Sequence, residues 1–163
     1  MKHGYTIADP FVDFQANQLI DDFHDFFNKI AGPELIAAGL MPGDMEAAVK
    51  ANFEDHIPAF MPKIEQYAAG PGRFLFGDKL TFADFWIGAF YNSKAACKDL
   101  CWGHQNGEWA AALQKYPAFV KFGEEYNKEL ANYLASRPAY PFREKTASLI
   151  ENETPYIYNS LYI

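Results

Sequence analysis

The chain has 163 residues, half of them hydrophobic, which is enough for one domain with a sizeable core. Its 21 acidic and 14 basic residues give a net charge of −7, which disfavours nucleic acid and anionic lipid as partners. Its two cysteines are too few for a disulfide-stapled secreted domain and favour a reducing compartment.

The first predicted helix covers residues 10–31. Its apolar residues recur at spacings of three and four, the period of one helix face. These residues are Ala16, Leu19, Phe23, Phe26, Phe27 and Ile30. Gly32-Pro33 is expected to end the helix, and a short apolar segment, 34–40, comes next before the chain breaks again at Met41-Pro42-Gly43.

A second long helix is predicted to begin at Asp44, a residue type that caps helix N-termini. Its apolar face consists of Val49, Phe53, Ile57, Phe60, Ile64 and Tyr67. Pro58 and Pro62 fall inside this helix, and Gly70-Pro71-Gly72 ends it. Because a mid-helix proline removes a backbone hydrogen bond and clashes with the preceding turn, we expect a kink or a break there.

The segment 77–85 specifies the start of a further helix in two ways. Thr81 is a good N-cap, because its hydroxyl can accept a hydrogen bond from a backbone N–H of the first turn. Asp84 stands three residues later, where its carboxylate can accept from the Thr81 N–H and complete a capping box. Leu80 and Phe85 occupy the two positions of a hydrophobic staple. All four residues are therefore assigned structural roles.

The helix that begins there is expected to run from Phe82 to about Leu100 and to be apolar on nearly every side, like a helix inside a bundle. A short helix is expected to end near Tyr116, and Pro117 opens another, because proline suits the first helical turn. Arg137-Pro138 is expected to end this last helix. Its apolar face comprises Phe119, Phe122, Tyr126, Leu130, Tyr133 and Leu134.

The helical period continues almost throughout, and no segment alternates as a strand would. We therefore predict an all-α fold, a bundle of about five or six helices. Residues 1–142 form the helical domain in this interpretation, and residues 143–163 form a tyrosine-rich tail with little periodicity.

Targeting signals are not evident in the sequence. The first six residues lack the apolar core of a signal peptide, and no apolar run is long enough to span a bilayer. The expected location is the cytoplasm, with a mitochondrial protein carrying an internal signal as the alternative.

The order of several motifs resembles the C-terminal, all-helical domain of sigma- and mu-type glutathione S-transferases. The similar pieces are the end of the linking helix, the acidic dimer-forming helix, a Leu-Pro-Lys-x-x-Glu stretch, the capping box and the last helix of that domain. They are Lys2-His3-Gly4-Tyr5, Leu19-Ile20-Asp21-Asp22-Phe23, Met61-Pro62-Lys63-Ile64-Glu65, Phe74-Leu75-Phe76-Gly77-Asp78 with Thr81-x-x-Asp84, and Tyr116-Pro117 with Tyr133-Leu134-Ala135-Ser136-Arg137-Pro138. The resemblance covers about residues 2–142.

In that family a thioredoxin-like domain precedes the bundle, binds glutathione and supplies the group that activates its thiol. This sequence begins where such a domain would end, with neither a β-α-β pattern nor a Cys-x-x-Cys motif. The resemblance therefore implies no catalytic residue here, and glutathione as a cofactor only if a partner domain is present. An acidic residue that reaches glutathione across the family's dimer corresponds to Lys29, beside Asn28, or to Asp25 if the register shifts by one turn.

The family's hydrophobic-substrate pocket is formed partly by this bundle. By resemblance, the substrate-binding residues would be Ile36, Leu40, Tyr156 and Tyr158. Ordinary packing or a covered interface is the alternative role for these side chains.

Two clusters carry side chains that can bind metals. One consists of Cys97, Cys101 and His104. A structural zinc site needs a fourth ligand and usually closer cysteines, so buried, inert cysteines are the preferred interpretation. The other consists of Asp21, Asp22, His24 and Asp25. We interpret it as a solvated or dimer-facing acidic edge, and expect no metal site.

The resemblance leaves two main functions open. The first is a non-catalytic interaction or assembly subunit, which would bind a protein partner, or form a homodimer, through the first two bundle helices and the surface left by the missing domain. The alternative is the hydrophobic-substrate half of a transferase that conjugates glutathione to electrophiles together with a thioredoxin-like partner. A carrier with a ligand pocket between helices is a third hypothesis. Whether the chain is an enzyme stays undecided at this stage.

Overall fold

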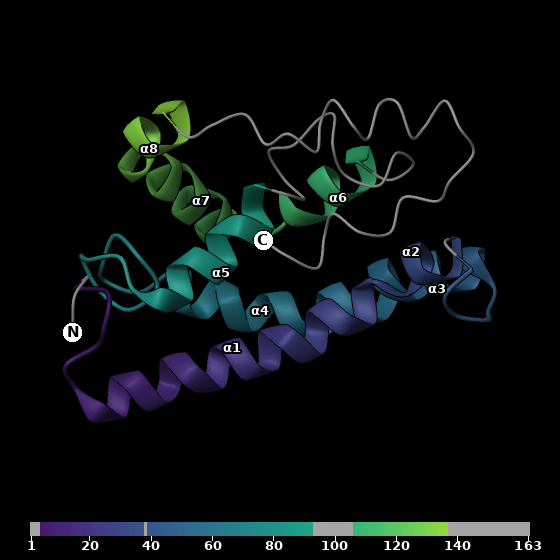
Figure 1. The fold of residues 1–163 in the computed structure, drawn as a ribbon, viewed down its shortest axis with the longest axis horizontal. Helices are drawn as coiled ribbons and strands as arrows, with labels where there is room; N and C mark the ends of the chain where they lie inside the picture. Colours follow the sequence, from purple (N-terminus) through teal and green to yellow (C-terminus); the bar gives the residue numbers. More distant parts are fainter. Residues whose placement is uncertain (1–3, 38, 93–105, 137–163) are drawn as a thin grey trace.

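The computed structural model describes residues 4–37, 39–92 and 106–136. Within these ranges the protein is helical and contains no strand, only an isolated bridge between Phe74 and Gly77. Figure 1 shows α1 along one long edge, α2 and α3 at one end, and α7 with α8 on the opposite side. The elements are α1 (Pro10–Ile30), α2 (Gly32–Ala37), α3 (Met45–Ala51), the π-helical segment η1 (Asn52–His56), α4 (Ile57–Ala68), α5 (Phe82–Tyr91), α6 (Asn106–Leu113), α7 (Pro117–Glu129) and α8 (Ala131–Ser136).

The all-α prediction is confirmed for this part of the chain. None of the described helices is long and apolar enough to cross a membrane. The expected end of α5 near residue 100 falls outside the described residues, so that boundary stays a prediction.

The first helix begins and ends close to its predicted limits. The Asp9 carboxylate accepts a hydrogen bond from the Phe11 N–H over 2.8 Å and caps α1. The helix ends at Ile30, close to the break predicted at Gly32-Pro33. These two residues form the start of α2. The short apolar segment after α1 is thus helical as far as Ala37.

The second long helix does not break at its prolines, but a π-helical segment interrupts its α-helical pattern just before Pro58, where a kink or a break was expected. Its cap is formed by Asp44, whose carboxylate accepts from the N–H groups of Glu46 and Ala47 over 2.9 and 3.2 Å. Helical structure then runs from α3 through η1 into α4, with Pro58 in the first turn of α4 and Pro62 inside it. Pro58 has no N–H to donate and its ring crowds the carbonyl four residues earlier, which accounts for the wider π-helical segment that precedes it.

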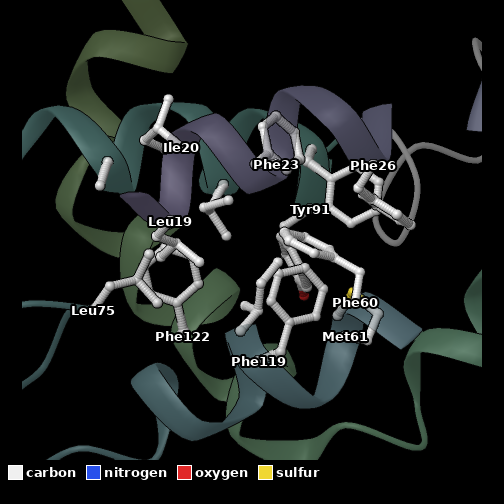
Figure 2. Close-up of a cluster of buried hydrophobic side chains, with 14 of the residues drawn as sticks. Leu19, Ile20, Phe23, Phe26, Phe60, Met61, Leu75, Tyr91, Phe119 and Phe122 are labelled. Atoms are coloured by element: carbon white, nitrogen blue, oxygen red, sulfur yellow. The ribbon is translucent and has the colours of Figure 1, made fainter. Parts of the chain in front are cut away.

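The core lies where α1, α4, α5 and α7 meet. About half of its buried residues are aromatic, and Figure 2 shows ten labelled core side chains from these helices and the loop before α5. The rings of Phe26 and Phe60 stack with their centroids 4.5 Å apart, and Phe23 meets Phe90 edge-on at 5.6 Å. Packing of this kind joins α1 to both α4 and α5.

The last predicted helix is wrong in its length. Residues 117–137 were expected to form one helix, but α7 ends at Glu129 and α8 begins at Ala131. Leu130 between them has φ −92° and ψ 6°, outside the helical conformation. The break turns the second part away from the apolar face, so that Tyr133, expected on that face, is 61% exposed.

Candidate functional site

The start of α5 is held by a hydrogen-bonded pair of side chains, Thr81 and Asp84. They form a reciprocal capping box, in which the Thr81 N–H donates to Asp84 Oδ2 over 2.6 Å. The Thr81 hydroxyl also donates to Oδ2, over 2.7 Å. Leu80 and Phe85, the two staple positions, are half-buried and pack against the core. The local sequence thus accounts for where α5 begins.

Asp84 also holds the loop that precedes α5. Its other oxygen, Oδ1, accepts from the Leu75 N–H over 2.9 Å. The side chain is fully buried, and burial raises the pKa of Asp84 while the hydrogen bonds from Thr81 and Leu75 act to lower it. No sequence motif indicated the contact with Leu75, because a capping box concerns only residues within one turn.

Tyr126 of α7 carries a second buried polar group, next to α5. Burial, together with the charge of Asp84 and the hydroxyl of Tyr133, raises the pKa of Tyr126 to about 12. The Tyr126 hydroxyl therefore stays protonated at neutral pH. The ring of Tyr126 contacts Phe85, with centroids 6.2 Å apart, and forms part of the core. Asp84 and Tyr126 thus have structural roles that account for their shifted pKa values.

The outer side of α5 differs from the prediction of a helix buried all round. Trp86 is 42% exposed, and Phe82, Phe85 and Ala89 are only half-buried. Spacings of three and four residues place these four side chains on one face of the helix. We call this surface the α5 face. It leaves large apolar side chains of an otherwise buried helix in contact with water.

Two aromatic side chains from other segments border the α5 face. The ring of His24, from α1, meets Trp86 edge-on with centroids 4.7 Å apart. Tyr5 meets Phe85 in the same way at 4.9 Å, and the Tyr5 carbonyl accepts from the Phe82 N–H over 3.3 Å. The segment before α1 therefore lies along the start of α5. The sequence pattern indicated an acidic edge around His24 but no contact with Trp86, since the two residues are 62 positions apart in the chain.

The residues proposed to bind substrate lie far from the α5 face or outside the described residues. Ile36 is half-buried in α2, and Leu40 is 61% exposed in the loop after α2. Both are at the end of the molecule formed by α2 and α3 (Figure 1). Tyr156 and Tyr158 lie outside the described residues. Of these four residues, the structure therefore places only Ile36 and Leu40 in the same region.

The acidic residues of α1 do not gather into one site. Asp21 and Asp25 are exposed, whereas the Asp22 carboxylate pairs with Lys63 of α4. Within the described residues, no three His, Cys, Asp or Glu side chains lie close enough together to hold a metal ion. The other candidate ligands, Cys97, Cys101 and His104, lie outside those residues.

The end of α1 carries the position that resemblance connects with glutathione. Lys29 lies in the last turn of α1 and is exposed, as is its neighbour Asn28. Asp25, one turn earlier, is exposed as well. Each of these three side chains is therefore accessible to a second molecule, and the structure of one chain favours none of them as the residue that contacts glutathione.

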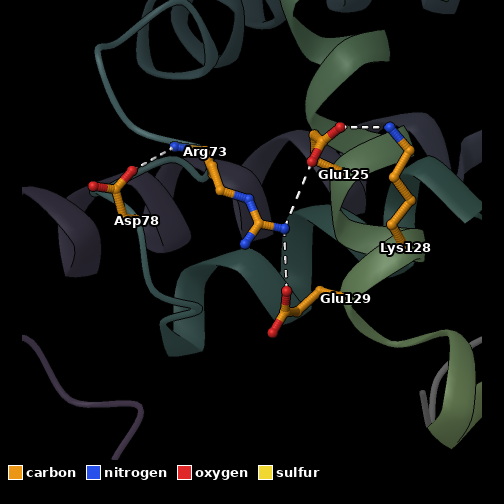
Figure 3. A network of polar contacts seen from close by, with 5 residues as sticks. All are labelled: Arg73, Asp78, Glu125, Lys128 and Glu129. Atoms are coloured by element: carbon orange, nitrogen blue, oxygen red, sulfur yellow. Dashed lines mark hydrogen bonds and ion pairs between the residues drawn. The ribbon is translucent and has the colours of Figure 1, made fainter.

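The loop between α4 and α5 is tied to α7 by charged side chains, which Figure 3 shows. The Arg73 guanidinium pairs with Glu129 over 3.1 Å and with Glu125 over 3.6 Å. Glu125 also accepts from the Lys128 ammonium over 2.6 Å, a hydrogen bond that lowers the pKa of Glu125. The backbone N–H of Arg73 donates to the Asp78 carboxylate over 3.2 Å. The network therefore holds the loop through both the backbone and the side chain of Arg73.

Two open grooves flank this loop at Gly70-Pro71-Gly72. One, of about 440 Å³, lies between the start of α1, the end of α4 and the loop, and contains the ring pair Tyr67–Phe76 with centroids 5.0 Å apart. The other, of about 320 Å³, lies between the loop and α7 and is lined by Lys121 and Glu125 among others. Both are open to solvent and neither includes a residue that the sequence proposed for substrate binding.

Comparison with known proteins identifies relatives of this fold. The sequence profile of the family described as "Glutathione S-transferase, C-terminal domain" matches residues 24–137. A glutathione S-transferase from the hookworm Necator americanus, described as monomeric, superposes with a TM-score of 0.65 at 20% identity, covering 86% of this chain and 64% of that one. The glutathione S-transferase from Ascaris lumbricoides gives a TM-score of 0.64 at 20% identity, covering 85% and 63%. A search of curated protein sequences finds no match.

At this level of identity the structural likeness concerns the fold. The chain spans about 64% of the length of the hookworm enzyme and about 63% of the Ascaris enzyme. The profile match covers the greater part of the chain, from the middle of α1 to the residue after α8.

Proposed function

The chain belongs to the family of glutathione S-transferase C-terminal domains, and on that premise we propose that it is an interaction module that docks a protein partner on the α5 face. In this proposal the chain contributes a binding surface and shape, and the partner contributes any catalytic group. The observation that carries the proposal is the 42% exposure of Trp86 on a helix whose other residues are apolar or belong to the capping box.

Trp86 has the properties of an anchor residue at a protein interface. Tryptophan offers a large apolar surface with little conformational entropy to lose, and it is enriched among the residues that dominate binding energy. The neighbouring Phe82, Phe85 and Ala89 extend the apolar surface along α5, and Tyr5 and His24 give it a polar border. An apolar centre with a polar rim is the usual organisation of a binding surface.

The partner class implied by the family resemblance is a thioredoxin-like domain. The test is to titrate the purified chain with an isolated thioredoxin-like domain of a glutathione S-transferase and to measure binding by calorimetry. We expect Trp86→Ser to weaken binding at least about tenfold, because truncation of a hot-spot residue costs about 2 kcal/mol or more and about 1.4 kcal/mol corresponds to tenfold. The matched control is Tyr133→Ser, which removes another exposed aromatic side chain, on α8.

Circular dichroism will show whether both variants keep their helices. Equal weakening by the two substitutions, or none by Trp86→Ser, would overturn the proposal that the partner docks on the α5 face. Measurable conjugation of glutathione by the chain alone would overturn its non-catalytic part.

The second candidate function is the hydrophobic-substrate half of a two-chain glutathione transferase. Its support is the position of Ile36 and Leu40 together at the end of the molecule formed by α2 and α3. With the partner domain present, conjugation of glutathione to an aromatic electrophile should appear, and Leu40→Ala should raise the KM for the electrophile more than it lowers kcat. No conjugation with any thioredoxin-like domain that binds the chain would exclude this function.

We also propose a homodimer, formed through α1 and the helical stretch from α3 through η1 to α4. The exposed Asp21 and Asp25 of α1 lie on the side of the helix that faces away from the core. Light scattering coupled to size-exclusion chromatography would measure the mass directly. A mass of one chain at all concentrations would exclude the homodimer and leave the α5 face as the binding surface.

A further inference from the structure

The end of the molecule formed by α2 and α3 carries a second exposed apolar surface. It consists of three flexible side chains, which we call the tip patch: Leu40, Met41 and Met45, exposed by 61%, 40% and 47%. Figure 1 places α2 and α3 at the opposite end of the molecule from the start of α1 and the start of α5. The tip patch is therefore separate from the α5 face.

The tip patch lies against the start of α2 and the loop that follows this helix. A side chain on Gly32 would come within 3.8 Å of the Met41 methyl group, so Met41 lies over the start of α2. Ile36 packs against Gly43 on the other side of the same loop. Helix α3 has no fully buried residue; Met45 and the half-buried Val49 are four positions apart and so share one face of the helix. Helix α3 is thus amphipathic, but this chain leaves its apolar side only partly covered.

The segment that carries the tip patch is mostly negative in charge. The segment 39–55 contains four acidic residues and one basic residue, in a chain whose net charge is −7. The basic residue, Lys50, is already paired with Glu54 at 3.7 Å. Asp44, Glu46 and Asp55 remain exposed and without a basic side chain paired to them among the described residues. This short segment therefore carries a disproportionate share of the negative charge.

We propose that the tip patch binds an amphipathic helix of another protein, one that carries Lys or Arg beside its apolar face. Such a helix would bury Leu40, Met41 and Met45 and place its cations against the carboxylates of Asp44 and Glu46, which flank Met45 in the chain. Methionine is unbranched and polarizable, so it adapts to apolar side chains of varied shape.

The charge also argues against the other occupants. A second copy of this chain docking tip to tip would bring like charges together, which is destabilising. Anionic membranes and nucleic acids would be repelled for the same reason. The proposal does not depend on the α5 face, and each can fail without the other.

The methionine methyl groups provide the test. The chain has four methionines, of which Met41 and Met45 lie in the tip patch and Met61 is fully buried. The full chain, labelled with ¹³C at the methionine methyls, is titrated with a synthetic Leu/Lys amphipathic helix of about 18 residues, or about five turns. We expect the Met41 and Met45 signals to shift and saturate while the Met61 signal stays in place.

Two further peptides separate a specific site from general attraction of cations. In one, every Lys is replaced by Glu; in the other, the same residues are scrambled so that the apolar face is lost. Neither should produce saturating shifts, and equal shifts with the scrambled peptide would overturn the proposal. Shifts of Met41 and Met45 on raising the protein concentration alone would assign the tip patch to self-association instead.

Variants locate the site on the tip patch. Met45→Ser removes apolar surface without changing charge and should weaken binding of the Leu/Lys helix about tenfold, whereas Phe11→Ser, at a 68% exposed position on α1, should not. Leu40→Ser gives a second measurement should Met45→Ser fail to fold. Unchanged affinity in the folded tip variants would overturn the proposal.

Discussion

The backbone of Gly88 lies directly against the ring of Tyr126. A methyl group on Gly88 would be 2.5 Å from both Cε1 and Cζ of that ring, closer than real Cβ contacts allow. The relationship is reciprocal, because Gly123 of α7 receives the ring of Tyr91 from α5 in the same manner. Each helix thus supplies one glycine and one tyrosine, and the absence of two side chains lets α5 and α7 approach closely.

Substitution Gly88→Ala should therefore destabilise the protein. The new methyl group would force Tyr126 or the whole of α7 to shift, and overpacking of this kind costs about 1–3 kcal/mol. This exceeds the gain of up to about 1 kcal/mol that alanine brings over glycine within a helix. Urea unfolding followed by tryptophan fluorescence measures the difference.

Gly32→Ala is the matched control for that measurement. A Cβ there would lie 3.8 Å from the Met41 methyl and 4.0 Å from Ala48 Cβ, which is ordinary contact, and Gly32 is also helical and buried. We expect Gly32→Ala to leave stability unchanged or to raise it slightly. Equal losses in both variants would contradict the role assigned to the Tyr126 contact.

Glu65 caps a helix to which it does not belong. Its carboxylate oxygens accept from the N–H groups of Ala118 and Phe119, over 2.9 and 2.8 Å, at the start of α7. Glu65→Ala would leave both donors without a partner in a half-buried place, which should lower the free energy of unfolding by about 1–3 kcal/mol. Glu124→Ala, at an exposed site on α7, is the control and should change it by less than about 0.5 kcal/mol.

The direction of the Asp84 pKa predicts an unusual pH dependence. Burial raises the pKa of Asp84 above 3.8, so between 3.8 and that higher value the folded chain holds a proton that the unfolded chain has lost. Stability from this group is therefore greatest at low pH and decreases as pH rises through the window. A carboxylate stabilised by a salt bridge would give the opposite slope.

The measurement compares the natural chain with Asp84→Asn from about pH 3.5 to 7. The stability advantage of the natural chain should shrink as pH rises above 3.8 and then become constant. An advantage that grows with pH would mean that the hydrogen bonds from Leu75 and Thr81 outweigh burial.

Thr81→Ala should lower stability by about 0.5–2 kcal/mol and leave partner binding by the folded protein unchanged.

Arg73 should contribute little to global stability despite its several partners. Its side chain and that of Glu129 are nearly half exposed, and solvent screens such pairs. We expect Arg73→Ala to shift the midpoint of thermal unfolding by no more than about 2 °C. The loop before α5, in contrast, should become more open to limited proteolysis. A large loss of stability that persists in high salt would contradict this view.

The positions of the helices were largely predictable from the sequence because their signals are local. Asp44 caps the helical stretch from α3 to α4, Pro117 lies in the first turn of α7, and Thr81 and Asp84 define the start of α5. Each of these signals acts within about one turn. The differences concern places where the local pattern is compatible with more than one outcome. The apolar period continues past Leu130, yet the helix ends there, and Pro58 produced a π-helical segment where a break was equally consistent with the sequence.

The sequence by itself determined that this chain is helical, where most of its helices start, and which family it resembles, since helical period and caps act over a few residues. Only the tertiary structure decided that Tyr126 fills the space beside Gly88, that Glu65 caps α7, and that Trp86 stays exposed next to His24. Each of those contacts joins residues 38 to 62 positions apart and depends on how closely and at what angle two helices cross. That geometry results from packing the whole core at once, and no single segment contains it.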